Sequence, residues 1–141
     1  MTDTSRNTVH TVLLYSPRQE RRAVIRSAIG RRPAGDLGRL EWVECATYDE
    51  VIEQVDRGDI ALAILDGEAQ PIGGMGLSRQ MKYELTECPA VVVVIARADD
   101  RWLATWSLAD ATLTYPVDPI IAGDVIAEQL RNRAAGVPVL R

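Results

Sequence analysis

Short apolar runs alternate with amphipathic segments along the whole chain. Runs this short, bounded by glycine, proline or polar residues, are typical of strands that are buried on both faces of a sheet. They predict strands at 9–15, 40–46, 60–66, 91–96 and 112–115. The segment after each run repeats apolar residues at helical spacing, which predicts five helices. This alternation favours an α/β fold, in which a doubly wound, five-stranded parallel sheet carries helices on both faces.

Local signals mark where some of the helices begin. Ser16 followed by Pro17 predicts an N-cap and a first helical residue. Thr47 with Glu50 three residues later matches a capping box. Asp118, directly before a proline, repeats the combination of cap and proline at the last helix.

The length of 141 residues fits one domain. We expect a disordered lead-in at 1–8, the domain at 9–134 and a tail at 135–141, with no output module after the last helix. The net charge of −4 gives no indication of nucleic-acid binding. The N-terminus lacks a signal peptide, and no apolar run reaches bilayer length, so we expect a cytoplasmic chain without membrane insertion.

The sequence contains few of the residues and motifs that histidine, cysteine or phosphate-loop chemistry requires. His10 is the only histidine, which leaves almost nothing for His-based metal sites or for Ser-His or Cys-His catalysis. Cys45 and Cys88 are expected at opposite ends of the sheet, so we expect no disulfide between them. The glycine-rich segment 73–76 lacks the spacing of a phosphate-binding loop.

The central apolar run, 60–66, ends in a single acid, Asp66. In open parallel sheets, ligands and chemistry collect at the carboxyl ends of the strands. Asp66 is therefore the first candidate for a functional residue. The alternative is an aspartate that merely ends a strand or caps a turn.

Five strand–helix units, Asp66 after the third strand and Tyr115-Pro116 after the fifth together resemble the receiver domain of two-component response regulators. The resemblance covers nearly the whole chain and implies a flavodoxin-like strand order, 2-1-3-4-5. It places Asp66 at the phospho-acceptor position of the family. It also implies a cis peptide bond before Pro116.

The chain departs from the family's pattern at most other positions of the site. The acidic pair that holds Mg²⁺ in the family falls here on Ser16 and Pro17. The hydroxyl residue at the end of the fourth strand falls on Ile95.

The corner after the fifth strand departs from the pattern as well. The family's Lys-Pro falls on Tyr115 and Pro116, so only the proline is kept, and the aromatic switch residue falls on Thr112. Phosphoryl transfer is catalysed by positioning and charge stabilisation, and Mg²⁺ requires several oxygen ligands. These departures therefore weaken metal binding, phosphoryl sensing and switching together.

Three acids are candidates to compensate for the missing pair: Glu68, Asp99 and Asp100. Glu68 follows Asp66, and the other two follow the fourth strand, so all three are expected at the same edge of the sheet. We expect Mg²⁺ binding only if these acids rebuild the metal site. The alternative is that they are solvated loop acids or, for Asp99 or Asp100, a helix cap.

Two groups of residues are candidates for a protein interface. Arg18, Arg22 and Arg26 form a basic stripe on the first helix, which is either a docking surface for an acidic partner or an ordinary solvated face. Trp102 and Trp106 lie one turn apart on the fourth helix. We expect them to pack in the core; exposure would instead indicate an interface.

The leading hypothesis is an atypical, stand-alone receiver (a pseudo-receiver) that acts in signal transduction through protein–protein interaction, without Mg²⁺-dependent phosphorylation. It is not an enzyme, needs no cofactor, and binds an unidentified protein or a second copy of itself. The second hypothesis keeps Asp66 as a phospho-acceptor through a nonstandard site. A remote third is a small nucleotide- or flavin-binding enzyme on the same fold.

Overall fold

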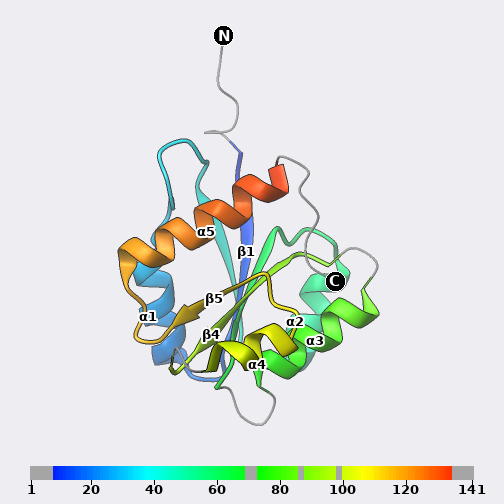
Figure 1. The fold of residues 1–141 in the computed structure, drawn as a ribbon. Helices are drawn as coiled ribbons and strands as arrows, with labels where there is room; N and C mark the ends of the chain where they lie inside the picture. The colour runs from blue at the N-terminus through cyan, green and yellow to red at the C-terminus, as the bar shows by residue number, and fades with distance from the viewer. Residues whose placement is uncertain (1–7, 69–72, 86–87, 98–99, 135–141) are drawn as a thin grey trace.

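The structure is a computed structural model that describes residues 8–68, 73–85, 88–97 and 100–134. Within these residues five strands alternate with five helices (Figure 1). In chain order the elements are β1 (His10–Tyr15), α1 (Gln19–Ile29), β2 (Leu40–Cys45), α2 (Tyr48–Asp56), β3 (Leu62–Asp66), α3 (Gly74–Glu84), β4 (Ala90–Ile95), α4 (Arg101–Trp106), β5 (Ala111–Thr114) and α5 (Pro119–Ala134). The predicted α/β alternation is thus confirmed.

The strands form one parallel sheet in the order β2-β1-β3-β4-β5, as the resemblance implies. β1 lies between β2 and β3, where Leu14 pairs with both Glu44 and Ile64. β3 pairs with β4 over its whole length, so that Asp66 lies opposite Val94. This register brings the carboxyl ends of β1, β3 and β4 to the same edge of the sheet.

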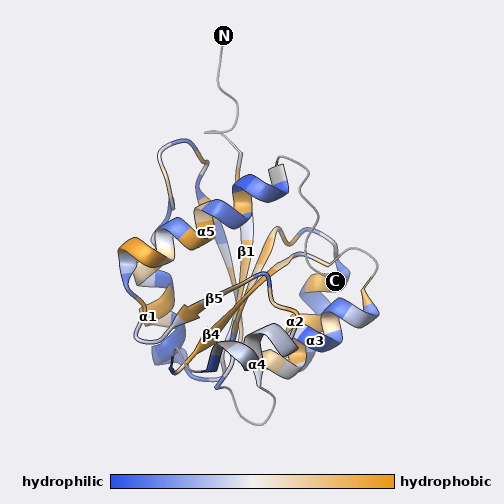
Figure 2. Cartoon of the chain, in the orientation of Figure 1, coloured by the Kyte–Doolittle hydropathy of each residue, from blue (hydrophilic) through white to orange (hydrophobic). Residues whose placement is uncertain are grey.

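Helices cover both faces of the sheet, as the all-apolar strands require (Figure 1). One core cluster joins apolar residues of α1 and α5 to the sheet, and a second joins those of α2 and α3 to the opposite face. All six residues of β4 are buried. Successive side chains of a strand point to opposite faces of the sheet, and helices cover both faces here. Figure 2 shows the hydrophobic colour concentrated along the central strands, with hydrophilic stretches on the outer sides of the helices.

The helix starts are partly as predicted. Thr47 is the N-cap of α2, accepting from the Glu50 N–H at 3.2 Å, and Asp118 accepts the first N–H groups of α5. The prediction for Ser16 is wrong: α1 begins at Gln19 with Arg18 as N-cap, and Ser16 is fully buried. The Ser16 hydroxyl instead bonds to a carboxylate from another strand.

The other sequence-based expectations concern single positions. Cys45 and Cys88 are both buried, and no disulfide joins them. Burial raises the pKa of the Cys45 thiol to about 11, so that it stays protonated. The peptide bond between Tyr115 and Pro116 is cis, as the resemblance implies. No helix in the described ranges is long and apolar enough to cross a membrane.

The long loop between α1 and β2 is held against the last helix. Arg131 of α5 donates two hydrogen bonds to the carboxylate of Asp36, at 2.9 and 2.6 Å. Leu37 is buried in the same core cluster as the apolar faces of α1 and α5. This loop therefore packs onto the domain rather than standing away from it.

Candidate functional site

Asp66 is the last residue of β3, and its side chain is buried at the carboxyl edge of the sheet. A buried carboxylate requires hydrogen-bond donors or a cation, because removing its charge from water is costly. The structure supplies both. This site is therefore built around a single acid whose environment decides what it can do.

Four donors occupy the two oxygens of the Asp66 carboxylate. Oδ2 accepts from the Ser16 hydroxyl at 2.9 Å and from Arg21 Nε at 2.9 Å. Oδ1 accepts from the Glu68 backbone N–H at 2.9 Å and from Arg21 Nη2 at 3.3 Å. A carboxylate offers about four lone-pair sites in total. The acceptor capacity of Asp66 is thus filled by the protein itself.

Arg21 is the cation of this site, and it comes from the first turns of α1. Its side chain is only 12% exposed, and its guanidinium meets the carboxylate with two nitrogens. The guanidinium carbon also lies 3.9 Å from the centroid of the Tyr115 ring. The cation is therefore fixed between a buried carboxylate and an aromatic face, two environments that suit a planar guanidinium.

The Tyr15 side chain, just before Ser16, is almost fully buried and remains a neutral phenol at physiological pH. Burial raises its pKa, and the negative charge of Asp66 raises it further. Tyr15 therefore adds no second negative charge to the site.

Two of the predicted site residues contact this centre. Ser16 donates to Asp66, and Tyr115 stacks on the guanidinium that binds Asp66. Tyr115, at the position of the family's lysine, thus supplies no cation itself. Its ring instead packs against the Arg21 guanidinium from α1. Pro17 is a half-buried bend residue between β1 and α1, and Pro116 follows Tyr115 on the exposed side of the corner.

The remaining predicted positions contribute less to the site. Ile95 is fully buried in the core, so its place offers packing and no hydroxyl, and Thr112 is a half-buried residue of β5. Glu68 contributes its backbone N–H, while its side chain is exposed. Asp100 pairs with Arg97 at 3.3 Å, and Asp99 lies outside the described residues.

Sequence reasoning missed Arg21, the residue that defines the site. A signal was present: Arg21 falls outside the stripe made by Arg18, Arg22 and Arg26. An arginine one turn into the helix after the first strand lies near the carboxyl edge of the sheet, where a buried acid needs a counter-ion.

The donor set does not fit Mg²⁺, the cofactor that the resemblance implies. Mg²⁺ prefers octahedral oxygen coordination, with one or two carboxylates among its ligands. Within the described part of the chain, no group of three or more His, Cys, Asp and Glu side chains could hold a metal ion. The Arg21 guanidinium already lies on both oxygens of Asp66, so a metal ion there would face a like charge.

The predicted basic stripe on α1 is largely paired within the chain. Arg22 and Arg26 both bind the carboxylate of Glu44, at 3.0 and 2.8 Å, and Arg18 pairs with Glu20 at 2.8 Å. Because these arginines already have carboxylate partners, the stripe offers an acidic partner less free charge than the sequence suggests.

The expectation that the tryptophans of α4 pack in the core is wrong. Trp102 is 68% exposed and Trp106 is 49% exposed. Helical spacing placed them on one face of α4, but spacing alone does not tell whether that face meets the sheet or solvent. Their exposure favours the interface alternative.

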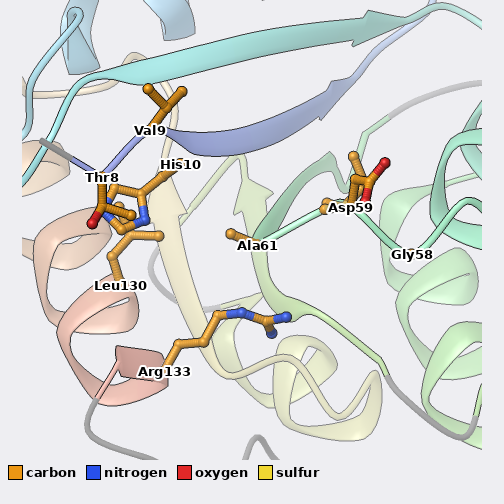
Figure 3. Close-up of a pocket in the computed structure, with 9 residues that line it drawn as sticks. Thr8, Val9, His10, Gly58, Asp59, Ala61, Leu130 and Arg133 are labelled. Carbon is orange, nitrogen blue, oxygen red and sulfur yellow. The ribbon is translucent and has the colours of Figure 1, made fainter.

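A cavity of about 400 Å³ lies at the opposite, amino edge of the sheet (Figure 3). His10, Asp59, Leu130 and Arg133 are among its lining residues. The buried His10 Nε2 has no hydrogen-bond partner among the described residues, and burial lowers the pKa of this imidazole, which keeps it neutral near pH 7. β3 separates this cavity from Asp66, so the two features are distinct.

Gly67 allows the turn that follows Asp66 to pass close to β4. A Cβ at this position would lie 2.6 Å from the backbone oxygen of Val94 and 3.1 Å from a methyl carbon of Val93. We predict that Gly67→Ala lowers the free energy of unfolding by about 1–3 kcal/mol, the usual range for overpacking. Urea unfolding monitored by circular dichroism measures this change.

Gly76 provides the matched control for that substitution. It lies within α3, and a Cβ there meets no atom within 4 Å. Gly76→Ala should therefore raise the free energy of unfolding by about 0.5–1 kcal/mol, since alanine favours a helix interior over glycine. Equal stability changes in the two variants would contradict the close approach at Gly67.

Comparison with solved structures defines the class of fold. A response regulator (signal receiver domain) from Bermanella marisrubri matches with a TM-score of 0.70 and 18% identity, covering 87% of this chain and 99% of that one. A CheY-like response regulator receiver domain protein from Methanospirillum hungatei JF-1 matches with a TM-score of 0.68 and 17% identity, covering 92% and 99%. The fold is thus that of a receiver domain.

Sequence comparison establishes the family. No protein-family model matches the chain. Response regulatory proteins of two strains of Mycobacterium tuberculosis are each 48% identical over 128 residues, covering 91% of this chain and 96% of the relative. The chain belongs to the response-regulator family and is a receiver domain of two-component signalling. Such domains are signalling proteins that work through contacts with other proteins.

Proposed function

We propose that this receiver domain signals through protein–protein contacts without Mg²⁺-dependent phosphorylation of Asp66. The observation that carries the proposal is the buried ion pair between Arg21 and Asp66. The pair gives the acid a permanent counter-ion from its own chain. In this role Asp66 is a structural acid that fixes the carboxyl edge of the sheet as a binding scaffold.

Hydrogen bonding to Asp66 supports the proposal because a carboxylate must use a lone pair to attack a phosphoryl group. The four donors on Asp66 leave no such site free. Phosphorylation would require Arg21 to leave both the carboxylate and the Tyr115 ring. It would also require charge stabilisation from a metal ion at a place that does not fit one.

Intact-mass measurement after incubation with Mg²⁺ and a small acyl phosphate tests the proposal. We expect no phosphoryl adduct on the wild-type chain and none on Asp66→Asn, while a receiver domain that keeps the acidic pair and lysine is labelled in the same mixture. An adduct that forms on the wild type and is lost in Asp66→Asn would contradict the proposal.

A second candidate function is favoured by the position of Asp66 itself, at the end of β3 where the family's phospho-acceptor lies. Under this alternative, Asp66 accepts a phosphoryl group through a nonstandard site and Arg21 serves as the cation that the family's lysine supplies. It predicts that Asp66→Asn abolishes labelling and also changes the binding of the partner. The mass measurement above separates the two candidates.

A further inference from the structure

The cavity at the amino edge of the sheet is built by three segments that lie far apart in the sequence. Residues 8–10 come from the start of β1, residues 58–61 lead into β3, and Leu130 and Arg133 belong to the end of α5 (Figure 3). Its volume of about 400 Å³ lies within the usual range for small-molecule sites, about 300–1,000 Å³. The cavity is therefore large enough to hold a small organic molecule.

Apolar side chains form much of the wall of this cavity. Ile60 and Leu130 are 5% and 1% exposed, so this part of the wall belongs to the core of the domain. Val9 and Ala61 add further carbon surface to the lining. Removing apolar surface from water is favourable by about 25 cal/mol per Å². The wall therefore favours a ligand that has a hydrocarbon part.

Arg133 brings a cation to the cavity. In Figure 3 its side chain extends from α5 toward the segment that carries Ala61. Arg131, two positions earlier, pairs with Asp36 at 2.6 Å, whereas no acid pairs with Arg133 in the described ranges. A guanidinium has five N–H donors in a planar fork that matches the geometry of a carboxylate. Arg133 is thus available to bind an oxyanion from outside the chain.

The imidazole of His10 supplies a second polar group. Its Nε2 is buried and has no hydrogen-bond partner among the residues that the structure describes, although buried polar atoms normally have one. The His10 backbone N–H donates to the Arg39 oxygen at 3.0 Å, which holds this residue at the edge of the sheet. A neutral imidazole that carries its proton on Nε2 can donate to a ligand oxygen.

Asp59 limits the charge that a ligand can carry. Its carboxylate lines the same cavity, and no cation pairs with it within the described part of the chain. Because like charges repel, each negative charge on a ligand meets an opposing interaction with Asp59. Arg133 and Asp59 together give the cavity no net charge. A monoanion is therefore favoured over inorganic phosphate, which is partly dianionic near neutral pH.

We propose that this cavity binds a small organic monocarboxylate with a short hydrocarbon body. The carboxylate binds Arg133 and accepts a hydrogen bond from His10 Nε2, while the hydrocarbon body packs on Ile60 and Leu130. The ligand thereby connects the starts of β1 and β3 to α5, and it stabilises the folded chain by binding it. The site uses none of the side chains around Asp66, so its test does not depend on the proposed function.

His10 provides the probe for this test, because it is the only histidine in the chain. The carbon-bound protons of its imidazole give a single set of NMR signals that needs no further assignment. At constant pH and ionic strength, isovalerate should shift these signals in a saturable way. The same concentrations of inorganic phosphate, or of the uncharged amide of isovalerate, should shift them much less. No saturable shift with isovalerate, or an equal response to phosphate, would overturn the proposal.

A matched pair of variants tests the role of Arg133. Arg133→Gln should raise the dissociation constant for isovalerate at least about tenfold, since it removes hydrogen bonds from a charged group. Arg131→Gln is the control, because Arg131 lies on the same helix and binds Asp36 instead; it should leave the affinity unchanged. Both variants are followed through the His10 signals. An isovalerate affinity that is the same in Arg133→Gln and the wild type would overturn the proposed site.

Discussion

Replacing Arg21 by methionine should lower the free energy of unfolding by about 3–5 kcal/mol, the range for breaking a buried ion pair from one side. Methionine has a similar length and removes the charge, so the buried Asp66 carboxylate would lose its counter-ion. The Ser16 hydroxyl and the Glu68 N–H would remain as its donors. Chemical denaturation of the two proteins under identical conditions measures the loss.

Arg18→Met is the matched control, because Arg18 forms an exposed ion pair with Glu20 at the start of the same helix. Exposed pairs contribute about 0–1 kcal/mol, so this variant should unfold almost like the wild type. The double variant Arg21→Met/Asp66→Asn should recover part of the stability lost in Arg21→Met, since it removes the unpaired charge. A loss in Arg21→Met no larger than that in Arg18→Met would show that the ion pair is not a structural element.

Lys82→Met should lower the free energy of unfolding by a similar amount, about 3–5 kcal/mol, at the opposite edge of the sheet from Asp66. The Lys82 side chain is fully buried, and its Nζ lies 2.7 Å from Asp110 Oδ2, whose side chain is 8% exposed. The same oxygen accepts from the Val91 N–H at 2.8 Å, at the start of β4. The pair thus connects α3 to the amino ends of β4 and β5. Without the ammonium group, the Asp110 carboxylate would lose the cation that lies 2.7 Å from its Oδ2.

Arg57→Met is the control for this substitution. Arg57 pairs with Glu53 one turn away on the surface, where both side chains are more than half exposed. The expected loss is about 0.3–0.5 kcal/mol, as for other exposed helix pairs. Thermal unfolding by calorimetry compares the two variants, and similar midpoints for both would contradict the buried ion pair.

The sheet could be predicted from the sequence because its strands are local, all-apolar runs. Asp66 was found for the same reason, since it ends one of those runs. The Thr47 cap was correct because a capping box is a contact between residues three apart. Both signals depend on contacts or patterns within a few residues, so they can be recognised without knowing the tertiary structure.

The chemistry of the site could not be predicted in the same way. Arg21 is 45 positions from Asp66 in the sequence, and their contact exists only once α1 packs beside β3. Ser16 was assigned to a helix cap because serine before proline fits that pattern locally, yet its hydroxyl bonds to an acid 50 positions away. The tryptophans of α4 carried the spacing of a buried face and are exposed. In each case the role of the side chain depends on whether it makes a contact with a residue far away in the sequence.

The most direct test of the central claim is a Mg²⁺ titration followed by the backbone amide resonance of Glu68. This N–H donates to Asp66 Oδ1 at 2.9 Å, so it reports any new ligand on the carboxylate. If Arg21 is the permanent counter-ion of Asp66, the Glu68 resonance stays unchanged as Mg²⁺ is added to the wild type. A saturable shift of that resonance in the wild type, absent in Asp66→Asn, would contradict the account.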